Sequence, residues 1–200
     1  MSRTGGASRV RRAVGPAPAG APRFTVRPLD PLADAELVHG WVTHPKAVYW
    51  MMQDARLQDI EREYMAKAAH DHQEAFIGLA DGKPSFLMES YDPRHVELGA
   101  LYPPEPGDVG LHFLVAPTDA PVHGFTRAAI SSAMRELFAD PATRRVVVEP
   151  DVRNDAARRI FEYAGFTVVS KIEKPEKDAY LCVCPRERFE RSAAGRPAAH

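Results

Sequence analysis

The sequence predicts an α/β fold in which helices pack on a mixed sheet. The first observation is that strand-like and helix-like patterns alternate along the second half of the chain. The second is "RRVVVEP" at 144–150, a short apolar run typical of the buried centre of a sheet. The third is Asp81-Gly82 between two apolar runs, which is a strong hairpin signal. The expected order is strand, two helices, three strands, helix, strand, helix and two strands.

Each element follows from its local pattern. The alternating "RFTVRPL" predicts a first strand near Phe24. Near-helical apolar spacing predicts helices over 32–43 and 56–71, and the apolar stripe of the second includes Tyr64 and Met65. Turn signals and caps then delimit the remaining elements. These are strands at 74–80, 84–92 and 109–117, a helix within 121–140, a strand at 144–150, a helix at 154–166 and strands at 167–174 and 178–185.

Composition indicates one domain of ordinary size. The chain has 200 residues, 44% of them hydrophobic, and Lys+Arg 26 against Asp+Glu 27 gives a net charge of -1. This balance gives no reason to expect nucleic acid or a membrane as partner, and Cys182 and Cys184 are expected to be reduced packing residues of a cytoplasmic protein. We expect a disordered tail at 1–23, the folded domain at 24–190 and a second disordered tail at 191–200.

One polar residue interrupts an apolar strand. In "GDVGLHFLVAPTD", Leu111, Phe113 and Val115 share one face of the predicted strand, and His112 and Leu114 share the other. A histidine in such a run is often a hydrogen-bonded core residue. The alternative is that His112 is a general base, because imidazole titrates near neutral pH.

The element order, together with "EPDVRNDAARRIFEYAGF" at 149–166, resembles the GCN5-related N-acetyltransferase (GNAT) superfamily. The segments "FLMESYDPRHVEL", "PGDVGLHFLVAP" and "VVVEPDVRNDAARRIFEYAGF" resemble its siderophore-biosynthesis branch, whose members acylate amines or hydroxylamines of lysine, N6-hydroxylysine or N-hydroxycadaverine. Within this branch the chain is most similar to desferrioxamine-pathway enzymes, which use N-hydroxycadaverine. The resemblance runs from about Phe24 to Glu190.

The resemblance implies a catalytic pair, His112 and Asp151. It also implies that acyl-CoA is a co-substrate rather than a permanently bound cofactor, with its pyrophosphate on the loop at 121–127. That loop keeps only Gly124 of the usual superfamily pattern. The residues that we expect to contact acyl-CoA are Phe113, Leu114, Val115, His123, Gly124, Phe125, Thr126, Arg127, Asn154 and Phe161.

The expected acceptor pocket is less specific in sequence. Trp50, Met51, Met52 and Gln53 are candidates for an alkyl tunnel or, equally, for an aromatic and Met-rich core edge. Glu89 and Tyr91 share one face of a predicted strand, where we expect Glu89 to meet a distal ammonium group. We expect Asp151 to orient the N–OH group and to stabilise the imidazolium of His112, and Glu149 to point the other way.

These residues predict an acyl-CoA-dependent N-acyltransferase that converts N-hydroxycadaverine to a hydroxamate, with succinyl-CoA or acetyl-CoA as donor, in siderophore biosynthesis. The alternatives are a lysine or N6-hydroxylysine N6-acyltransferase, an aminoglycoside-type N-acetyltransferase and a non-enzymatic acyl-CoA sensor. The expected partners are small molecules only, with no metal, and the chain as a monomer or homodimer. The pattern does not choose between the two donors.

Overall fold

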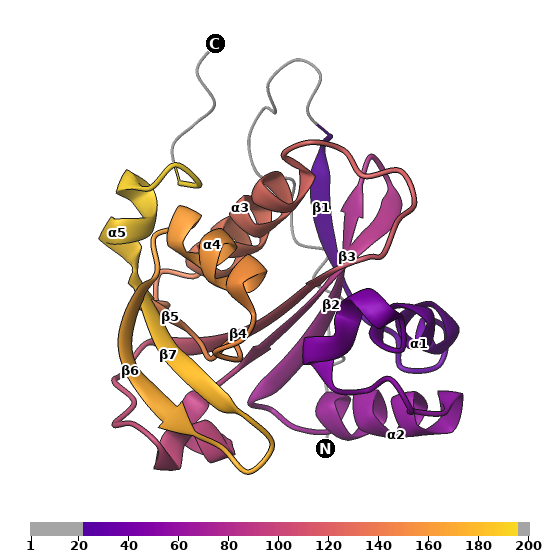
Figure 1. The fold of residues 1–200 in the computed structure, drawn as a ribbon, viewed down its shortest axis with the longest axis horizontal. Helices are drawn as coiled ribbons and strands as arrows, with labels where there is room; N and C mark the ends of the chain where they lie inside the picture. The colour runs from indigo at the N-terminus through magenta and orange to yellow at the C-terminus, as the bar shows by residue number, and fades with distance from the viewer. Residues whose placement is uncertain (1–21, 196–200) are drawn as a thin grey trace, which may run out of the picture.

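The computed structural model describes residues 22–195, so residues 1–21 of the expected tail at 1–23 and residues 196–200 of the expected tail at 191–200 lie outside the described residues. The elements follow the predicted order (Figure 1), with three short 3-10 helices (η1–η3) and a C-terminal helix that the patterns did not indicate. They are β1 (Phe24–Pro28), α1 (Ala35–Val42), η1 (Pro45–Trp50), α2 (Leu57–Ala68), β2 (Gln73–Ala80), β3 (Lys83–Tyr91), η2 (Pro93–His95), η3 (Glu97–Ala100), β4 (Asp108–Val115), α3 (Phe125–Phe138), β5 (Arg145–Val148), α4 (Asp155–Tyr163), β6 (Thr167–Glu173), β7 (Asp178–Pro185) and α5 (Arg186–Arg191).

The seven strands form one mixed sheet in the order β1-β2-β3-β4-β5-β7-β6. Only β4 and β5 pair in parallel, as expected for strands joined by the α3 crossover. The β2–β3 hairpin turns at Asp81 and Gly82, whose φ angles of 49° and 80° are both positive. Two such residues define the tight turn that the Asp-Gly pair predicted.

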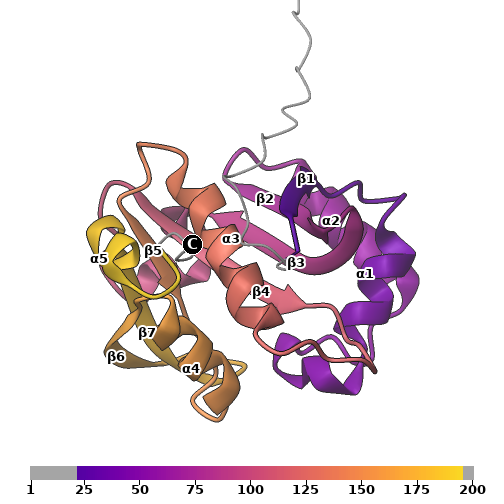
Figure 2. The same cartoon turned by 90° about the horizontal axis from the view of Figure 1, so that it is seen from above.

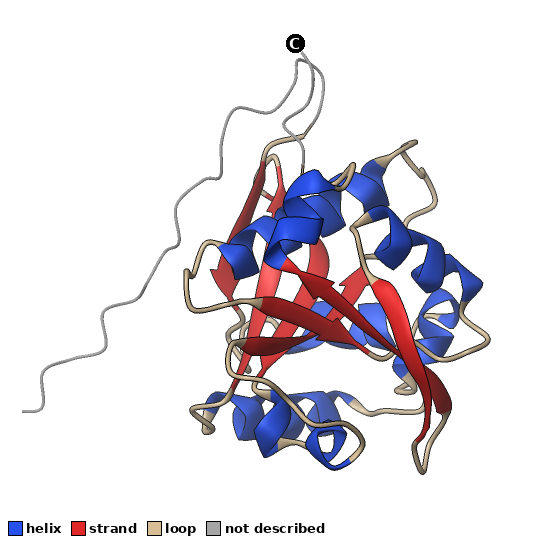
Figure 3. Cartoon of the chain, turned by 90° about the vertical axis from the view of Figure 1, so that its left-hand side faces the viewer, coloured by secondary structure: helices blue, strands red, loops and turns tan. Residues whose placement is uncertain are grey.

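Helices cover both faces of the sheet (Figure 3). On one face, α1 and α2 pack on Ile77 and Leu87 through residues such as Val38 and Ile60. On the other, α3 and α4 join a larger core that includes Leu111, as well as both cysteines, which are free and buried. The alternation along β4 is confirmed, because Phe113 and Val115 pack with the larger core and Leu114 packs with the α1–α2 side.

The sheet opens between β4 and β5. Their pairing covers three residue pairs and ends at Gly110↔Val147, whereas β4 continues beside β3 to Val115. On its other side β5 stays paired with β7 as far as Val148↔Cys182. The two strands therefore follow different neighbours, and Figure 2 shows the β1–β3 part and the β5–β7 part on opposite sides of α3 and β4.

Two expectations about the periphery are wrong. Met65 is 54% exposed, because Ile60 and Tyr64, four positions apart on α2, form the buried contact instead. Residues 191–195 are not an extended tail, since Arg191 ends α5, Ala194 is buried and the Ala194 carbonyl accepts a hydrogen bond from Arg135.

Gly110 leaves room for a tyrosine ring in the centre of the sheet. A Cβ atom at Gly110 would lie 2.1 Å from the Tyr91 ring, so Gly110→Ala should displace the ring and lower the free energy of unfolding by about 1–3 kcal/mol. Gly40→Ala is the matched control, because Gly40 lies within α1 and a Cβ atom there would meet nothing within 4 Å. This substitution should raise the free energy of unfolding by about 0.5–1 kcal/mol. Urea denaturation measures both, and equal values for the two variants would contradict the packing argument.

Candidate active site

A row of ionisable side chains crosses the sheet at the point where β4 and β5 separate. Glu89 on β3 lies directly opposite His112 on β4. In the parallel pair, Gly110 lies opposite Val147, so two residues further on His112 comes level with Glu149. Strand alternation and register therefore place Glu89, His112 and Glu149 on one face of the sheet, the face that α2 covers.

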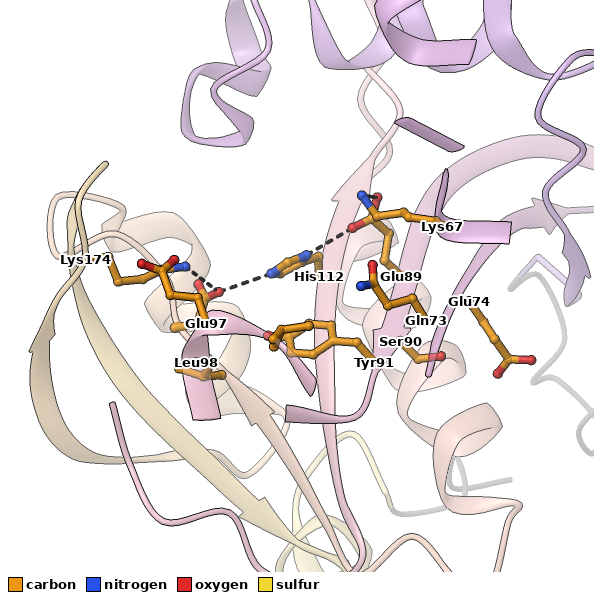
Figure 4. A pocket seen from close by; sticks show the side chains of 12 residues that line it. Lys67, Gln73, Glu74, Glu89, Ser90, Tyr91, Glu97, Leu98, His112 and Lys174 are labelled. Atoms are coloured by element: carbon orange, nitrogen blue, oxygen red, sulfur yellow. Dashed lines mark hydrogen bonds and ion pairs between the residues drawn. The ribbon is translucent and has the colours of Figure 1, made fainter. Parts of the chain in front are cut away.

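His112 contacts a carboxylate through each ring nitrogen (Figure 4). Nδ1 lies 3.0 Å from Glu89 Oε2, and Nε2 lies 3.2 Å from Glu149 Oε1. A neutral imidazole has one N–H donor, whereas an imidazolium has two. Because both contacts are to carboxylates, this geometry favours the imidazolium.

Helix α2 supplies the remaining partners of Glu89. The Tyr64 hydroxyl donates to Glu89 Oε1 over 2.8 Å, and Lys67 Nζ lies 3.5 Å from the same oxygen. Tyr64 and Lys67 are three residues apart and hence on the same helix face. These partners and His112 outweigh the effect of burial and lower the pKa of Glu89 to about 2.

The turn between β6 and β7 supplies the remaining partners of Glu149. Lys177 Nζ lies 2.7 Å from Oε2 and Lys174 Nζ lies 3.3 Å from Oε1. Burial alone would raise the pKa of this carboxyl group, but His112 and the two lysines lower it below its usual value. The row therefore alternates in charge, from Lys174 and Lys177 through Glu149, His112 and Glu89 to Lys67.

The two carboxylates determine the charge of His112. Burial lowers the pKa of the ring, but the hydrogen bonds and charges of Glu149 and Glu89 raise it further, to about 9. His112 is therefore an imidazolium at pH 7. It is not sealed in the core, since its side chain is 41% exposed and faces two cavities.

The two cavities meet at His112. The larger, of about 460 Å³, extends from η1 and α2 across the opening between β4 and β5 to α4. The smaller, of about 190 Å³, lies between the end of β3 and η3. Both are lined by the row itself, namely Lys67, Glu89, His112, Glu149 and Lys174.

The structure changes the expected roles of the two carboxylates after β5. Glu149 was expected to point away from His112, which is wrong, because residues 149 and 151 are two apart in extended backbone and share a face. Asp151 lines the larger cavity, but it accepts hydrogen bonds from the backbone, Nε and Nη2 atoms of Arg153 at 2.8, 2.9 and 2.6 Å. These bonds lower the pKa of Asp151 to about 2. Within the described residues no hydrogen bond joins Asp151 to His112, so the carboxylates that stabilise the imidazolium are Glu89 and Glu149.

The expected acceptor residues separate into two groups. Trp50 lines the larger cavity, with its ring centroid 6.1 Å from that of His112 in an edge-on arrangement, and Met51 and Met52 line the same cavity. Gln53 does not line either cavity, because its amide is bonded to the Ala47 carbonyl at 2.7 Å. Glu89 is held by three groups of the protein, so its carboxylate is not left for a ligand ammonium.

Most of the residues expected to contact acyl-CoA lie along the opening. Phe113, Leu114, Asn154 and Phe161 line the larger cavity, and Val115 follows on β4. Asn154 also caps α4, since its side-chain oxygen accepts a hydrogen bond from the Ala157 backbone N–H.

The expected pyrophosphate loop leads into α3. Gly124, with φ 79°, is the N-cap residue, and His123 before it is exposed. Phe125 and Thr126 open the helix, and Arg127 lies over the Tyr163 ring. The first N–H groups of a helix have no partner within the helix. Here the Phe125 N–H donates to the Val122 carbonyl at 3.1 Å, whereas those of Thr126 and Arg127 have no backbone partner among the described residues.

The sequence patterns missed Lys67, Lys174 and Lys177. The available signal was the i, i+3 spacing of Tyr64 and Lys67 on a predicted helix, next to an acidic residue at the centre of a predicted strand. Nothing local marked Lys174 and Lys177, because their partner Glu149 lies on another strand.

Comparison with known proteins identifies the class. Residues 30–174 match the family described as "Acetyltransferase (GNAT) domain". This match covers well over half of the chain, and the chain therefore belongs to the GNAT acetyltransferase family and is an enzyme that transfers acyl groups to nitrogen.

Three curated relatives are named as acyltransferases of lysine, N(6)-hydroxylysine or N-hydroxyputrescine. The chain is 29% identical over 172 residues to lysine N-acyltransferase MbtK of Mycobacterium sp. (strain MCS), a match that covers 86% of this chain and 70% of that protein. It is 27% identical over 157 residues to the N-hydroxyputrescine acetyltransferase of Acinetobacter baumannii, covering 78% of this chain and 74% of that protein. The N(6)-hydroxylysine O-acetyltransferase of Escherichia coli is 27% identical, over 83% of this chain and 53% of that protein.

Solved structures support the fold. An uncharacterized protein from Bacillus halodurans superposes with a TM-score of 0.79 at 27% identity, covering 85% of this chain and 88% of that one. The aminoglycoside acetyltransferase AAC(6')-Ib, solved with ribostamycin and coenzyme A, gives a TM-score of 0.75 at 22% identity over 85% of this chain and 97% of that one. At that identity the likeness concerns the fold alone.

The charged row predicts how stability depends on pH. A histidine whose pKa rises to about 9 on folding stabilises the protein fully below pH 6.5, and this stabilisation is lost as the pH rises through 9. His112→Gln should therefore lower the free energy of unfolding by about 1–2 kcal/mol more at pH 6 than at pH 9.5, allowing for solvent screening of a ring that is 41% exposed. Urea denaturation of both proteins across this range measures the difference, and a constant difference would contradict the assigned imidazolium.

Proposed function

We propose that the protein acylates N-hydroxycadaverine, with succinyl-CoA or acetyl-CoA as donor, to give an N-hydroxy-N-acylcadaverine for a desferrioxamine-type siderophore. The observation that carries the proposal is His112, held between Glu89 and Glu149 where two cavities meet. A two-substrate acyl transfer needs such a point, where donor and acceptor approach one base from different sides.

The donor is assigned to the larger cavity. Beyond Gly110 the β4 backbone no longer pairs with β5, so residues 111–115 offer peptide groups to a pantetheine arm. The free N–H groups at the start of α3 suit the pyrophosphate, and the positive φ of Gly124 turns the chain into that helix. Asn154 uses its oxygen as a cap and keeps its NH₂ group for a pantetheine amide.

The acceptor nitrogen then attacks the thioester carbon. A hydroxylamine is far less basic than an alkylamine, so it arrives neutral near pH 7. Its C–N bond forms, the C–S electron pair leaves with the CoA sulfur, and the N–H proton passes to Nε2 of neutral His112 and from there to the thiolate. Glu89 keeps a proton on Nδ1 of His112 and so fixes the tautomer of the ring. Lys174 and Lys177 hold Glu149 in place while Nε2 of His112 accepts and releases the proton.

A diamine-type acceptor agrees with the charges of the cleft. In the smaller cavity the carboxylates of Glu74, Glu89, Glu97 and Glu149 outnumber the cations, which are Lys67, Lys174 and the His112 imidazolium. Both lysines are already paired with glutamates, and a carboxylate on the acceptor would compete with those pairs. The relative from Acinetobacter baumannii is named for N-hydroxyputrescine, also an N-hydroxydiamine.

The acceptor preference tests the proposal directly. We expect N-hydroxycadaverine to give a higher kcat/KM than cadaverine, because the protonated alkylamine must lose a proton before it attacks. We also expect it to exceed N6-hydroxylysine, whose extra carboxylate needs a cation that the cleft has already paired. Thiol release from acetyl-CoA and succinyl-CoA with each amine measures the three values.

Each rival outcome identifies a different enzyme. Equal or better use of N6-hydroxylysine would overturn the diamine assignment in favour of a lysine-type acceptor. Equal use of cadaverine would remove the requirement for the hydroxylamine. Acylation of aminoglycosides but of none of the three amines would overturn the proposal altogether.

The base has a pH signature of its own. Since the pKa of His112 is about 9, its neutral form increases tenfold per pH unit below that value, and kcat/KM should rise from pH 7 to about 9 and then level off. His112→Ala should lower turnover by about 10²–10⁴-fold and abolish the rise. Glu149→Gln removes one of the carboxylates that raise the pKa, so it should move the rise to lower pH. A rate that falls between pH 7 and 9 in the unmodified protein would contradict the role of His112 as base.

A further inference from the structure

The smaller cavity, whose charges suit the proposed acceptor, contains groups that the reaction at His112 does not use. It has a volume of about 190 Å³, and Figure 4 shows the side chains that line it around His112.

Tyr91 lines this pocket, and its hydroxyl group has no hydrogen-bond partner among the described residues. Tyr91 is 7% exposed, and its hydroxyl oxygen is buried. An unpaired buried hydroxyl is unfavourable and rare in native proteins. The ring lies 4.9 Å from that of His112, and Gly110 beneath it provides the space. The arrangement leaves an unpaired hydrogen-bonding group on a residue that both lines the pocket and contacts His112.

A carboxylate without a partner stands at the same pocket. Glu97 on η3 lines it and makes no ion pair or hydrogen bond within residues 22–195, whereas Glu89 and Glu149 are fully engaged in the row. In Figure 4 the Glu97 side chain rises toward the level of His112, and that of Glu74 points away.

We propose that this pocket binds the distal ammonium group of a linear N-hydroxydiamine, with the Glu97 carboxylate and the Tyr91 hydroxyl as its partners. An ammonium group has three donors, which a carboxylate and a phenolic oxygen both accept. Burial raises the pKa of Tyr91 well above its usual value, so the hydroxyl stays neutral beside the cation. The proposal rests on the function proposed above and replaces Glu89, already occupied, as the site of distal recognition.

The test compares two acceptors that differ only at the distal end. N-hydroxypentylamine has the same five-carbon chain as N-hydroxycadaverine but lacks the distal ammonium group. We expect Glu97→Gln to raise the KM for N-hydroxycadaverine about 10-fold with little change in kcat, and to leave the KM for N-hydroxypentylamine unchanged. Tyr91→Phe should raise the same KM several-fold, since it removes the hydroxyl and keeps the ring.

Glu74→Gln is the matched control, because it removes the same charge from the rim of the same pocket. If Glu74→Gln and Glu97→Gln raised the KM for N-hydroxycadaverine equally, the overall negative charge of the pocket rather than Glu97 itself would attract the ammonium group, and the proposal would be overturned. Equal KM values of the unmodified protein for the two acceptors would overturn the subsite and leave the acyltransferase function standing. Absence of turnover with both hydroxylamines would instead overturn the proposed function, and the subsite with it.

Discussion

The structure depends on an imidazolium held between two buried carboxylates. Glu89 and Glu149 are 4% and 5% exposed, and ionised groups at such positions are unfavourable unless each is paired and hydrogen-bonded. His112 provides one partner to both carboxylates, and each takes its others from a different part of the chain. Tyr64 and Lys67 come from α2, and Lys174 and Lys177 come from the β6–β7 turn. Elements far apart in sequence thus converge on one line of charge.

The charged row holds the side chains of the site in place although the sheet is open beside them. The sheet separates between β4 and β5, so backbone hydrogen bonds no longer join its halves at the cavity. Contacts between side chains replace them, with Glu89 and His112 on one side of the opening and Glu149 on the other. Tyr49 adds a second link at the cavity mouth, since its hydroxyl donates to the Arg153 carbonyl at 3.0 Å. The opening can therefore admit a ligand while His112 keeps its orientation.

The sequence predicted what depends on local pattern. The element order, the Asp81–Gly82 hairpin and the two faces of β4 follow from periodicity and turn chemistry, and the structure confirms them. The partners of His112 depend on register between strands and on the approach of α2 and the β6–β7 turn, which no local pattern encodes. Glu149 was the exception. It lies two residues before Asp151 in extended backbone, so the face expected for Asp151, which is that of His112, is also the face of Glu149. Sequence similarity drew attention to the aspartate, and strand geometry identifies the glutamate as the contacting residue.

The same electrostatics bear on the kind of nitrogen that this site can acylate. Carboxylates that raise the pKa of an imidazole also raise that of an alkylamine bound beside it, and so would keep such an amine protonated and without a lone pair for attack. A hydroxylamine starts from much lower basicity and can stay neutral in the same field. The N-hydroxydiamine that we propose as acceptor would therefore bring a neutral nitrogen to His112, and its distal ammonium group would be attracted to the carboxylate of Glu97, which is unpaired among the described residues.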